Sequence, residues 1–331
     1  MIGSGLLSRA GEYIRDHFSF SRVFVLTDDT VYGLYGEKVL KSLHDAGLLA
    51  DIAVIPHGEE NKNFAVLQDV LEKMALSGLQ RDGAVVAVGG GVVSDLAGFA
   101  AAVYKRGVPV LNLPTTLLSA VDAAIGGKNG VDLGSIKNLA GTICQPVLVL
   151  IDTQVLKELP EELICEGAGE MLKYGVLMGG KLLDQMADGE WMDHLEECVS
   201  ECVRYKARLV MEDEQDRSMR RLLNLGHTFA HAIEALSSFS IPHGRAVAMG
   251  VRMAFGAAES DPERFLAAAE KCRLKEKCPF GAEEMMRKMR SDKKREGNST
   301  PLILPIALGC CRVVPVSDEE LLAAVKRGLL V

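Results

Sequence analysis

The first half of the chain alternates short apolar runs with stretches whose apolar residues recur at helical spacing, and this alternation limits the fold more than any other feature. Short continuous apolar runs predict strands that are buried on both faces. Strand–helix–strand repetition then predicts a parallel sheet with helices on both sides. The predicted strands cover residues 21–27, 50–55, 84–88, 108–113 and 147–151, and the predicted helices cover 35–46 and 64–77.

The second half has a different pattern, in which helices dominate. A chain of 331 residues exceeds what one hydrophobic core usually serves. We therefore expect two domains, 1–155 and 156–331, with the boundary near 152–156. The predicted helices of the second domain cover 161–177, 192–211, 219–236 and 245–258, and a small hairpin is predicted from 301–306 and 310–316.

Charge and composition argue against several classes of protein. The net charge of −8 disfavours nucleic acid as a main partner. No stretch reaches the length of an uncharged membrane-spanning helix, and the first residues lack the basic start and long apolar run of a signal peptide. None of the eight cysteines forms a CxxC pair. We therefore expect reduced thiols in a cytoplasmic protein that has no membrane partner.

A glycine-rich turn is the first candidate binding site. Residues 84–98 read AVVAVGGGVVSDLAG, an apolar strand that runs into three glycines and then into a helical pattern. Glycine lets the backbone approach a pyrophosphate closely, and a helix N-terminus adds free N–H groups and partial positive charge. A tight turn without a ligand explains the same pattern equally well.

Polar residues near the other predicted strands also have two interpretations. Thr115 and Thr116 follow the strand 108–113, where their hydroxyls suit a ribose or a nicotinamide amide but also suit a helix cap. Asp28 follows the first strand and either holds adenosine hydroxyls or caps a turn. Glu59 and Lys62 lie beside a turn, where a solvated surface pair is the default interpretation.

Three segments of the second half carry residues that suit metal chemistry. Glu170 and Lys173 lie one helical turn apart, and His227 and His231 share a helix face at i, i+4. His243 follows after a break in the helical pattern. One carboxylate and two imidazoles form a sound zinc set that leaves a position for substrate. Each histidine taken alone is better explained as a helix-surface or core residue, so both alternatives remain.

Nearly the whole chain resembles the 3-dehydroquinate synthases, which are sugar phosphate cyclases. The resemblance rests on ordered blocks: GGGVVSDLAGFAAAVYKRG (89–107), PTTLLSAVDAAIGGKNGV (114–131), KNLAGT (137–142), EGAGEMLKYG (166–175), RRLLNLGHTFAHAIEA (220–235) and HGRAVAMG (243–250). It implies an α/β fold in which an N-terminal Rossmann-like parallel-sheet domain, 1–155, binds NAD. It also implies an all-helical C-terminal domain, 156–331, that binds metal and substrate, an active site between the domains, and a homodimer.

The resemblance also implies individual roles. Glu170, His227 and His243 match the family's metal ligands, with zinc or cobalt as the ion, and His231 matches an active-site histidine that is not a ligand. Arg106 matches an arginine lent to the neighbouring subunit. The residues that match the substrate set are Asp122, Lys128, Asn138, Lys173, Lys206, Arg220, Asn224 and Lys293 or Lys294. The residues that match the NAD positions are Asp28, Glu59, Lys62, Gly90, Gly91, Val92, Asp95, Thr115, Thr116, Lys128 and Lys137.

The family reaction converts 3-deoxy-D-arabino-heptulosonate 7-phosphate to 3-dehydroquinate and phosphate, a step of the shikimate pathway of aromatic amino acid biosynthesis. It runs through transient oxidation by NAD, phosphate elimination, re-reduction and intramolecular aldol closure. Related cyclases tend to change the asparagine or second histidine of the NLGHTFxH block, and Asn224 and His231 are both present here. An iron-type NAD-dependent polyol dehydrogenase would instead release NADH stoichiometrically. An inactive descendant is expected to lose Lys128, Lys173 or a ligand, and none is lost.

The chain departs from the family pattern at a few positions. Arg245 stands where the family's HGEAV block has glutamate, which adds positive charge beside the third predicted ligand. Glu158 replaces a usual threonine near the nicotinamide, Ala230 replaces a glycine, and residues 161–163 replace a proline–arginine–glutamate run. We expect these changes to affect oligomer contacts, cofactor affinity and rate.

Overall fold

A computed structural model of the chain describes residues 1–134, 136–290 and 299–331. The chain divides into two compact units, Met1–Leu159 and Pro160–Val331. No helix in the described part is long and apolar enough to cross a membrane. All eight cysteines lie in the described part, and none of them forms a disulfide there.

A five-stranded parallel sheet forms the centre of the first unit and confirms the predicted sheet. Its strands are β2 (Arg22–Asp28), β3 (Leu49–Ile55), β4 (Ala84–Gly89), β5 (Val110–Pro114) and β8 (Leu148–Val149). They follow the order β3-β2-β4-β5-β8. A separate parallel pair joins β1 (Ile2–Gly3) to β9 (Ile151–Asp152).

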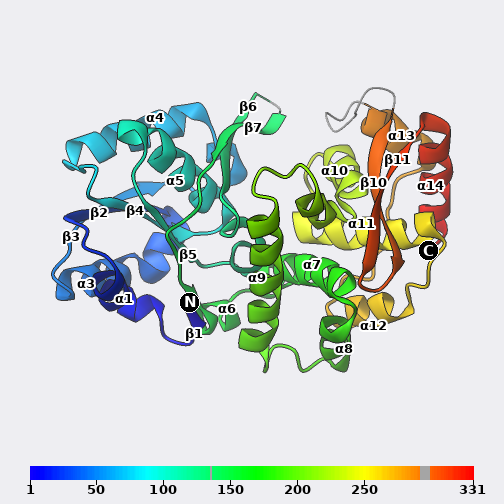
Figure 1. Cartoon of the computed structure of the whole chain (residues 1–331), viewed down its shortest axis with the longest axis horizontal. Helices are drawn as coiled ribbons and strands as arrows, with labels where there is room; N and C mark the ends of the chain where they lie inside the picture. The colour runs from blue at the N-terminus through cyan, green and yellow to red at the C-terminus, as the bar shows by residue number, and fades with distance from the viewer. Residues whose placement is uncertain (135, 291–298) are drawn as a thin grey trace. The chain divides into compact units, whose positions relative to one another are not determined.

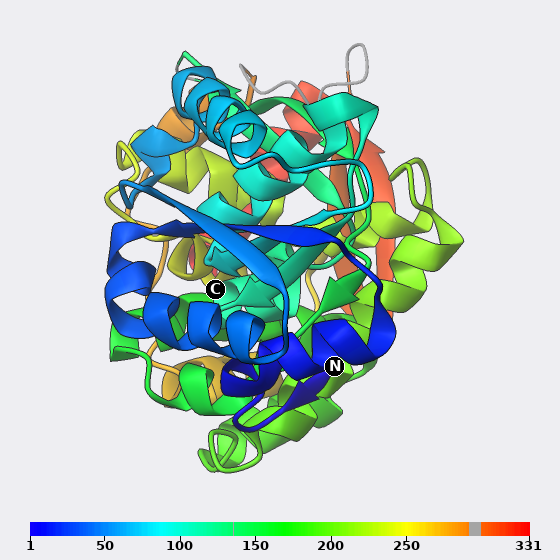
Figure 2. The same cartoon turned by 90° about the vertical axis from the view of Figure 1, so that its left-hand side faces the viewer.

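Helices cover both faces of this sheet (Figures 1 and 2). They are α1 (Ala10–His17), α2 (Asp29–Val31), α3 (Glu37–Asp45), α4 (Phe64–Leu76), α5 (Gly91–Val103) and α6 (Thr153–Lys157). Successive side chains of a strand point to opposite faces. On β2, Val23 and Val25 pack in one core cluster with residues of α1 and α3, whereas Phe24 and Leu26 pack in the other with residues of α4 and α5. Burial on both faces explains why these strands are continuously apolar.

A β-hairpin that the sequence did not predict extends the first unit. It consists of β6 (Lys128–Leu133) and β7 (Ile136–Ile143), paired antiparallel. Its sequence mixes glycine and asparagine with few alternating apolar residues, so it carries no clear strand pattern. The hairpin packs against α5, where the side chain of Asn129 occupies the space that a Cβ on Gly98 would need.

The second unit is helical apart from the predicted hairpin, which is confirmed as β10 (Thr300–Ala307) and β11 (Cys310–Val316). Its helices are α7 (Glu161–Met178), α8 (Lys181–Asp188), α9 (Leu195–Glu212), α10 (His227–Leu236), α11 (His243–Ala258), α12 (Glu263–Lys271), α13 (Ala282–Arg290) and α14 (Asp318–Leu330).

One predicted helix of this unit is wrong in its extent. The pattern over 219–236 predicted a single helix, but the chain forms a 3₁₀ segment, Met219–Asn224, and then α10. Leu225 has a non-helical ψ of 125° and Gly226 has a φ of 78°, so the break occurs at these two residues. Glycine adopts this left-handed conformation at little cost, and His227 consequently becomes the first residue of a new helix.

Candidate functional site

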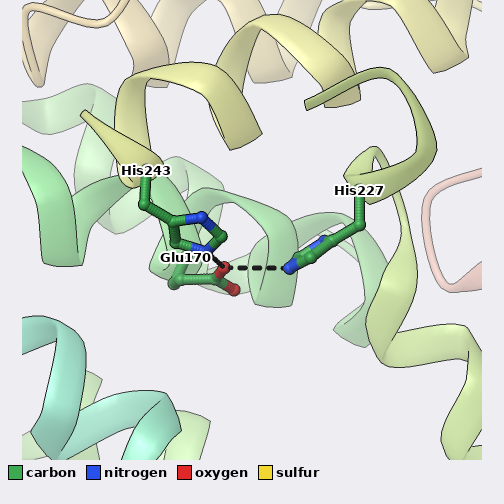
Figure 3. Close-up of side chains that lie close together, drawn as sticks. All are labelled: Glu170, His227 and His243. Carbon is green, nitrogen blue, oxygen red and sulfur yellow. Dashed lines mark hydrogen bonds and ion pairs between the residues drawn. The ribbon is translucent and has the colours of Figure 1, made fainter. Parts of the chain in front are cut away.

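The three predicted metal ligands come together in the second unit. One ligand atom from each of Glu170, His227 and His243 lies within 4.8 Å of the others. Glu170 is in the middle of α7, whereas His227 and His243 are the first residues of α10 and α11. Figure 3 shows both imidazole rings turned toward the carboxylate of Glu170. The segments that carry these residues are far apart in sequence, so their convergence depends on the packing of three helices.

Glycines allow these helices to approach each other closely. A Cβ on Gly169 would lie 2.1 Å from the carbonyl oxygen of Gly244, and a Cβ on Gly244 would lie 2.0 Å from the carbonyl oxygen of Glu166. A Cβ on Gly250 would similarly lie 2.2 Å from the carbonyl oxygen of Gly226. The contacts of Gly244 with Gly169 and Glu166 set α11 against α7, and the contact of Gly250 with Gly226 sets α11 against the start of α10. Each of these contacts involves a glycine that is adjacent in sequence to a candidate ligand.

Both histidines present the same ring atom to Glu170. The Nε2 atoms of His227 and His243 lie 3.4 Å and 3.2 Å from Oε1 of Glu170. Their Nδ1 atoms face acceptors, the carbonyl oxygen of Leu225 at 3.2 Å and Oε1 of Glu234 at 3.3 Å. Metal-binding histidines usually donate one ring N–H to such an acceptor and coordinate through the other nitrogen. The donor set and its orientation therefore fit a divalent cation.

The charges around the site also favour a cation. Burial alone would raise the pKa of Glu170, but the nearby Lys173 and His227 outweigh it and hold the pKa well below its usual range. Burial would lower the pKa of His243, but hydrogen bonds with Glu170 and Glu234 outweigh burial and raise the pKa to about 10. The two carboxylates that stabilise a proton on His243 would likewise stabilise a metal ion. Burial lowers the pKa of His227, which favours the neutral ring that a metal requires.

Further predicted substrate residues of this unit are buried cations. Lys173, Lys206 and Arg220 are all among its buried residues. Arg220 donates from Nη1 to the carbonyl oxygen of Glu214 at 2.7 Å, and its backbone N–H donates to Oδ2 of Asp213 at 3.1 Å. Buried cations of this kind suit an anionic substrate, because charge-assisted hydrogen bonds are strong when water is excluded.

The remaining predicted residues of this unit lie near the histidines or outside the described range. The ring centroids of His227 and His231 are 5.6 Å apart, and Asn224 donates from Nδ2 to the carbonyl oxygen of Arg221 at 3.2 Å. Lys293 and Lys294 fall outside the described residues.

Arg245 points toward the segment that follows α12. Its Nη1 donates to Oε1 of Glu276 at 2.5 Å and to the carbonyl oxygen of Arg273 at 3.2 Å. The positive charge that replaces the family's glutamate is therefore paired with a carboxylate of its own unit.

In the first unit, the glycine turn joins a strand to a helix as the sequence predicted. Gly90 precedes α5 as its N-cap residue, and Gly91 and Val92 form the first turn of the helix. Asp28 caps α2 by accepting a hydrogen bond from the N–H of Val31 at 2.8 Å. This agrees with the interpretation of Asp28 as a capping residue. The first turn of α5 keeps N–H groups that suit an anion.

Thr115 and Thr116, which follow β5, differ in the hydrogen bonding of their hydroxyls. Oγ1 of Thr116 accepts a hydrogen bond from the N–H of Ser119 at 3.2 Å, so Thr116 acts as a helix cap. Thr115 is buried, and its hydroxyl has no hydrogen-bond partner within the described residues. A buried hydroxyl without a partner is costly. Its position at the carboxyl end of a parallel strand fits a bound dinucleotide.

Lys62 is not part of a solvated surface pair, so the default interpretation of Glu59 and Lys62 is wrong. Lys62 is only 4% exposed. Its Nζ forms an ion pair with Asp95 of α5, lies 3.9 Å from Oε1 of Glu59, and donates to Oδ1 of Asn138 at 2.6 Å. Nζ of Lys137 also lies 3.9 Å from Glu59. The hairpin β6–β7 therefore contacts this buried lysine through Asn138.

A cavity of about 410 Å³ lies between the hairpin and α5. Asp95, Lys128 and Asn138 line it, so predicted cofactor and substrate residues share one cavity. Thr142 and Asn129 also line it, and sequence reasoning missed both because the hairpin was not predicted. Asp122 lies in the π-helical turn Ser119–Ala123, and Arg106 is exposed with a φ of 67°.

Comparisons with known proteins relate the chain to one family of enzymes. The family model for the N-terminal part of 3-dehydroquinate synthase matches residues 52–166, and the model for the C-terminal part matches residues 167–295. The chain is 38% identical to a curated 3-dehydroquinate synthase of Streptococcus pneumoniae (strain ATCC 700669 / Spain 23F-1). That match covers 97% of this chain and 94% of the relative.

Solved structures of other cyclases have the same fold. The chain is similar to the 2-epi-5-epi-valiolone synthase of Streptomyces hygroscopicus subsp. jinggangensis 5008, solved with NAD⁺ and Zn²⁺, with a TM-score of 0.85 and 27% identity over 98% of this chain and 94% of that one. A 2-deoxy-scyllo-inosose synthase gives a TM-score of 0.87 at 23% identity over 99% of this chain and 96% of that one. With both family models and a relative matching along the chain, it belongs to the 3-dehydroquinate synthase family.

Proposed function

We propose that the 3-dehydroquinate synthase activity of this chain acts on 3-deoxy-D-arabino-heptulosonate 7-phosphate with NAD and one divalent cation, zinc or cobalt. The observation that carries this proposal is the convergence of two Nε2 atoms on one buried carboxylate, with each Nδ1 facing an acceptor. The cyclases of similar fold that were solved with NAD⁺ and Zn²⁺ or Co²⁺ support it. The domain 156–331 would hold the cation and much of the substrate.

Two groups supply the chemistry that side chains lack. NAD supplies reversible hydride transfer, and the cation lowers the pKa of the substrate hydroxyl that is oxidised. Glu170, His227 and His243 hold the cation, and the glycine contacts between α7, α10 and α11 keep these ligands together. The chain itself therefore contributes position, charge and proton transfer.

The basic residues bind the two anionic groups of the substrate. Lys173, Lys206 and Arg220 are buried in the second unit, where they suit a carboxylate or a phosphate. Lys128 and Asn138 line the cavity of the first unit and likewise suit an anionic group. His231 lies beside the proposed ligand His227, where an imidazole suits proton transfer. The other proposed substrate residues are Asp122, Asn224, Lys293 or Lys294, and Arg106 from the partner of a homodimer.

The domain 1–155 would bind the dinucleotide. The first turn of α5 offers N–H groups to the pyrophosphate, and the hydroxyl of Thr115 gains a partner in the cofactor. Lys62, Asp95 and Glu59 form the charged network beside it. The other proposed contacts are those of Asp28, Gly90, Gly91, Val92, Thr116, Lys128 and Lys137. We place the enzyme in the cytoplasm, which agrees with its negative net charge and unpaired cysteines.

A phosphate-release assay tests this function. The purified chain is incubated with the heptulosonate phosphate, with and without NAD and a strong chelator, while absorbance at the NADH maximum is followed. We expect one phosphate per dehydroquinate, dependence on both NAD and metal, and no net NADH. Stoichiometric NADH without phosphate release would assign the chain to the dehydrogenase class instead.

A further inference from the structure

Glu234 belongs to the same cluster as the candidate metal ligands, although the sequence patterns did not assign it. It lies on α10, seven residues after His227, and is only 7% exposed. Residues at i and i+7 share one face of a helix. Its Oε1 is 3.3 Å from Nδ1 of His243, whose Nε2 faces Glu170. A buried carboxylate thus lies behind the ring of one candidate ligand.

His227 and His243 differ in the group that faces Nδ1 of the imidazole ring. For His227 it is the carbonyl oxygen of Leu225, only two residues away in the chain. For His243 it is Oε1 of Glu234, a side chain of another helix, α10. A side-chain partner can be removed by mutation, whereas a backbone carbonyl cannot.

We propose that Glu234 is a positioning residue that accepts the Nδ1–H of His243 and so presents the Nε2 lone pair to the cation. The inference deepens the proposed function, on which it rests. The carboxylate keeps the proton on Nδ1, makes the imidazole a better donor, and fixes the angle of the ring between α10 and α11. Loss of such a partner typically lowers metal affinity about 10–100-fold.

Zinc affinity measured by competition with a chelator tests the proposal on the whole chain. Glu234→Ala should bind zinc about 10–100-fold more weakly than the wild type. Glu234→Gln should lose less, because its amide oxygen still accepts the Nδ1–H but lacks the charge. Glu263→Ala removes an exposed carboxylate from α12 of the same unit and should bind zinc as the wild type does. Circular dichroism and urea unfolding establish that each variant is folded.

A double-mutant cycle separates positioning from general structural damage. If Glu234 acts through His243, Glu234→Ala should cost no further affinity in a chain that already carries His243→Ala. If Glu234→Ala does not fold, Glu234→Gln decides the matter through its zinc affinity and the visible spectrum of bound Co²⁺, both of which should differ from the wild type because an uncharged acceptor makes the imidazole of His243 a weaker metal ligand.

Wild-type zinc affinity in both Glu234 variants would overturn the proposal. It would also be overturned if Glu234→Ala lowered zinc affinity as much in the His243→Ala chain as it does in the wild type. The proposed function is tested separately. If the variants bind zinc with the predicted affinities but the wild-type chain releases no phosphate, the role of Glu234 stands and the proposed activity is refuted. If the wild-type enzyme releases phosphate but the Glu234 variants bind zinc as the wild type does, the activity stands and the role of Glu234 is refuted.

Discussion

Lys173 and Glu170 lie one helical turn apart on α7 and form an ion pair in which neither side chain is more than 1% exposed. Nζ of Lys173 also lies 4.7 Å from the ring centroid of Tyr174. Burial of two charges is costly unless they remain paired. The pair therefore links the stability of α7 to the charge of a candidate metal ligand.

Replacing Lys173 with methionine should destabilise the chain by about 3–5 kcal/mol, because it leaves the carboxylate of Glu170 buried without its cation. Added zinc should restore part of this loss, since the metal supplies positive charge to the same carboxylate. Urea unfolding with and without zinc measures both effects. A Lys173→Met chain that gains no more stability from zinc than the wild type would contradict this link.

Replacing Gly244 with alanine should destabilise the chain by about 1–3 kcal/mol or more and weaken metal binding, because the new Cβ would collide with the backbone of Glu166. Gly33→Ala is the control, since nothing lies within 4 Å of a Cβ there. Thermal unfolding and zinc content would be compared for the two variants. Equal behaviour of both variants would show that α7 and α11 do not need this close contact.

Replacing Thr115 with valine should weaken NAD binding about three- to tenfold while leaving the free energy of unfolding unchanged or raised. The reason is that the hydroxyl is buried without a partner among the described residues, so its removal costs the free chain nothing. Fluorescence titration with NAD and urea unfolding give the two quantities. Thr300→Val, a buried threonine of the second unit, should leave NAD affinity unaltered. A loss of stability with unchanged NAD affinity would assign Thr115 a structural role.

Replacing Asp213 with alanine should raise KM more than it lowers kcat. The carboxylate of Asp213 accepts hydrogen bonds from the N–H groups of Arg217, Ser218 and Arg220, and these bonds lower its pKa to about 2. Because the folded chain lowers the pKa of this carboxyl, the ionised carboxylate stabilises the turn at every pH above the ordinary aspartate pKa. This stabilisation is lost as the pH falls toward about 2. The turn should therefore be intact at neutral pH and hold Arg220 for the substrate. Steady-state kinetics with an unchanged KM would refute that role.

The sheet and the helices of the second unit were predictable because buried parallel strands and amphipathic helices have strong patterns. The hairpin β6–β7 was not, since its stability comes from packing on α5 rather than from alternation of its own residues. The burial of Lys62 depends on that hairpin and was missed with it.

The candidate metal ligands could be named from the resemblance, but their arrangement could not. It depends on close backbone contacts at Gly169 with Gly244 and at Gly226 with Gly250, which no local pattern reveals. Glu234 could have been found, because it lies at i+7 from His227 on the same helix. Its contact with Nδ1 of His243, however, is visible only in the structure.

Anomalous diffraction at the zinc absorption edge, from crystals grown with zinc and NAD, tests the central claim most directly. We predict one strong peak about 2.0–2.2 Å from Nε2 of His227, Nε2 of His243 and a carboxylate oxygen of Glu170. A zinc-loaded crystal with its peak at other side chains, or with no peak beside Glu170, would contradict the metal site and the chemistry built on it.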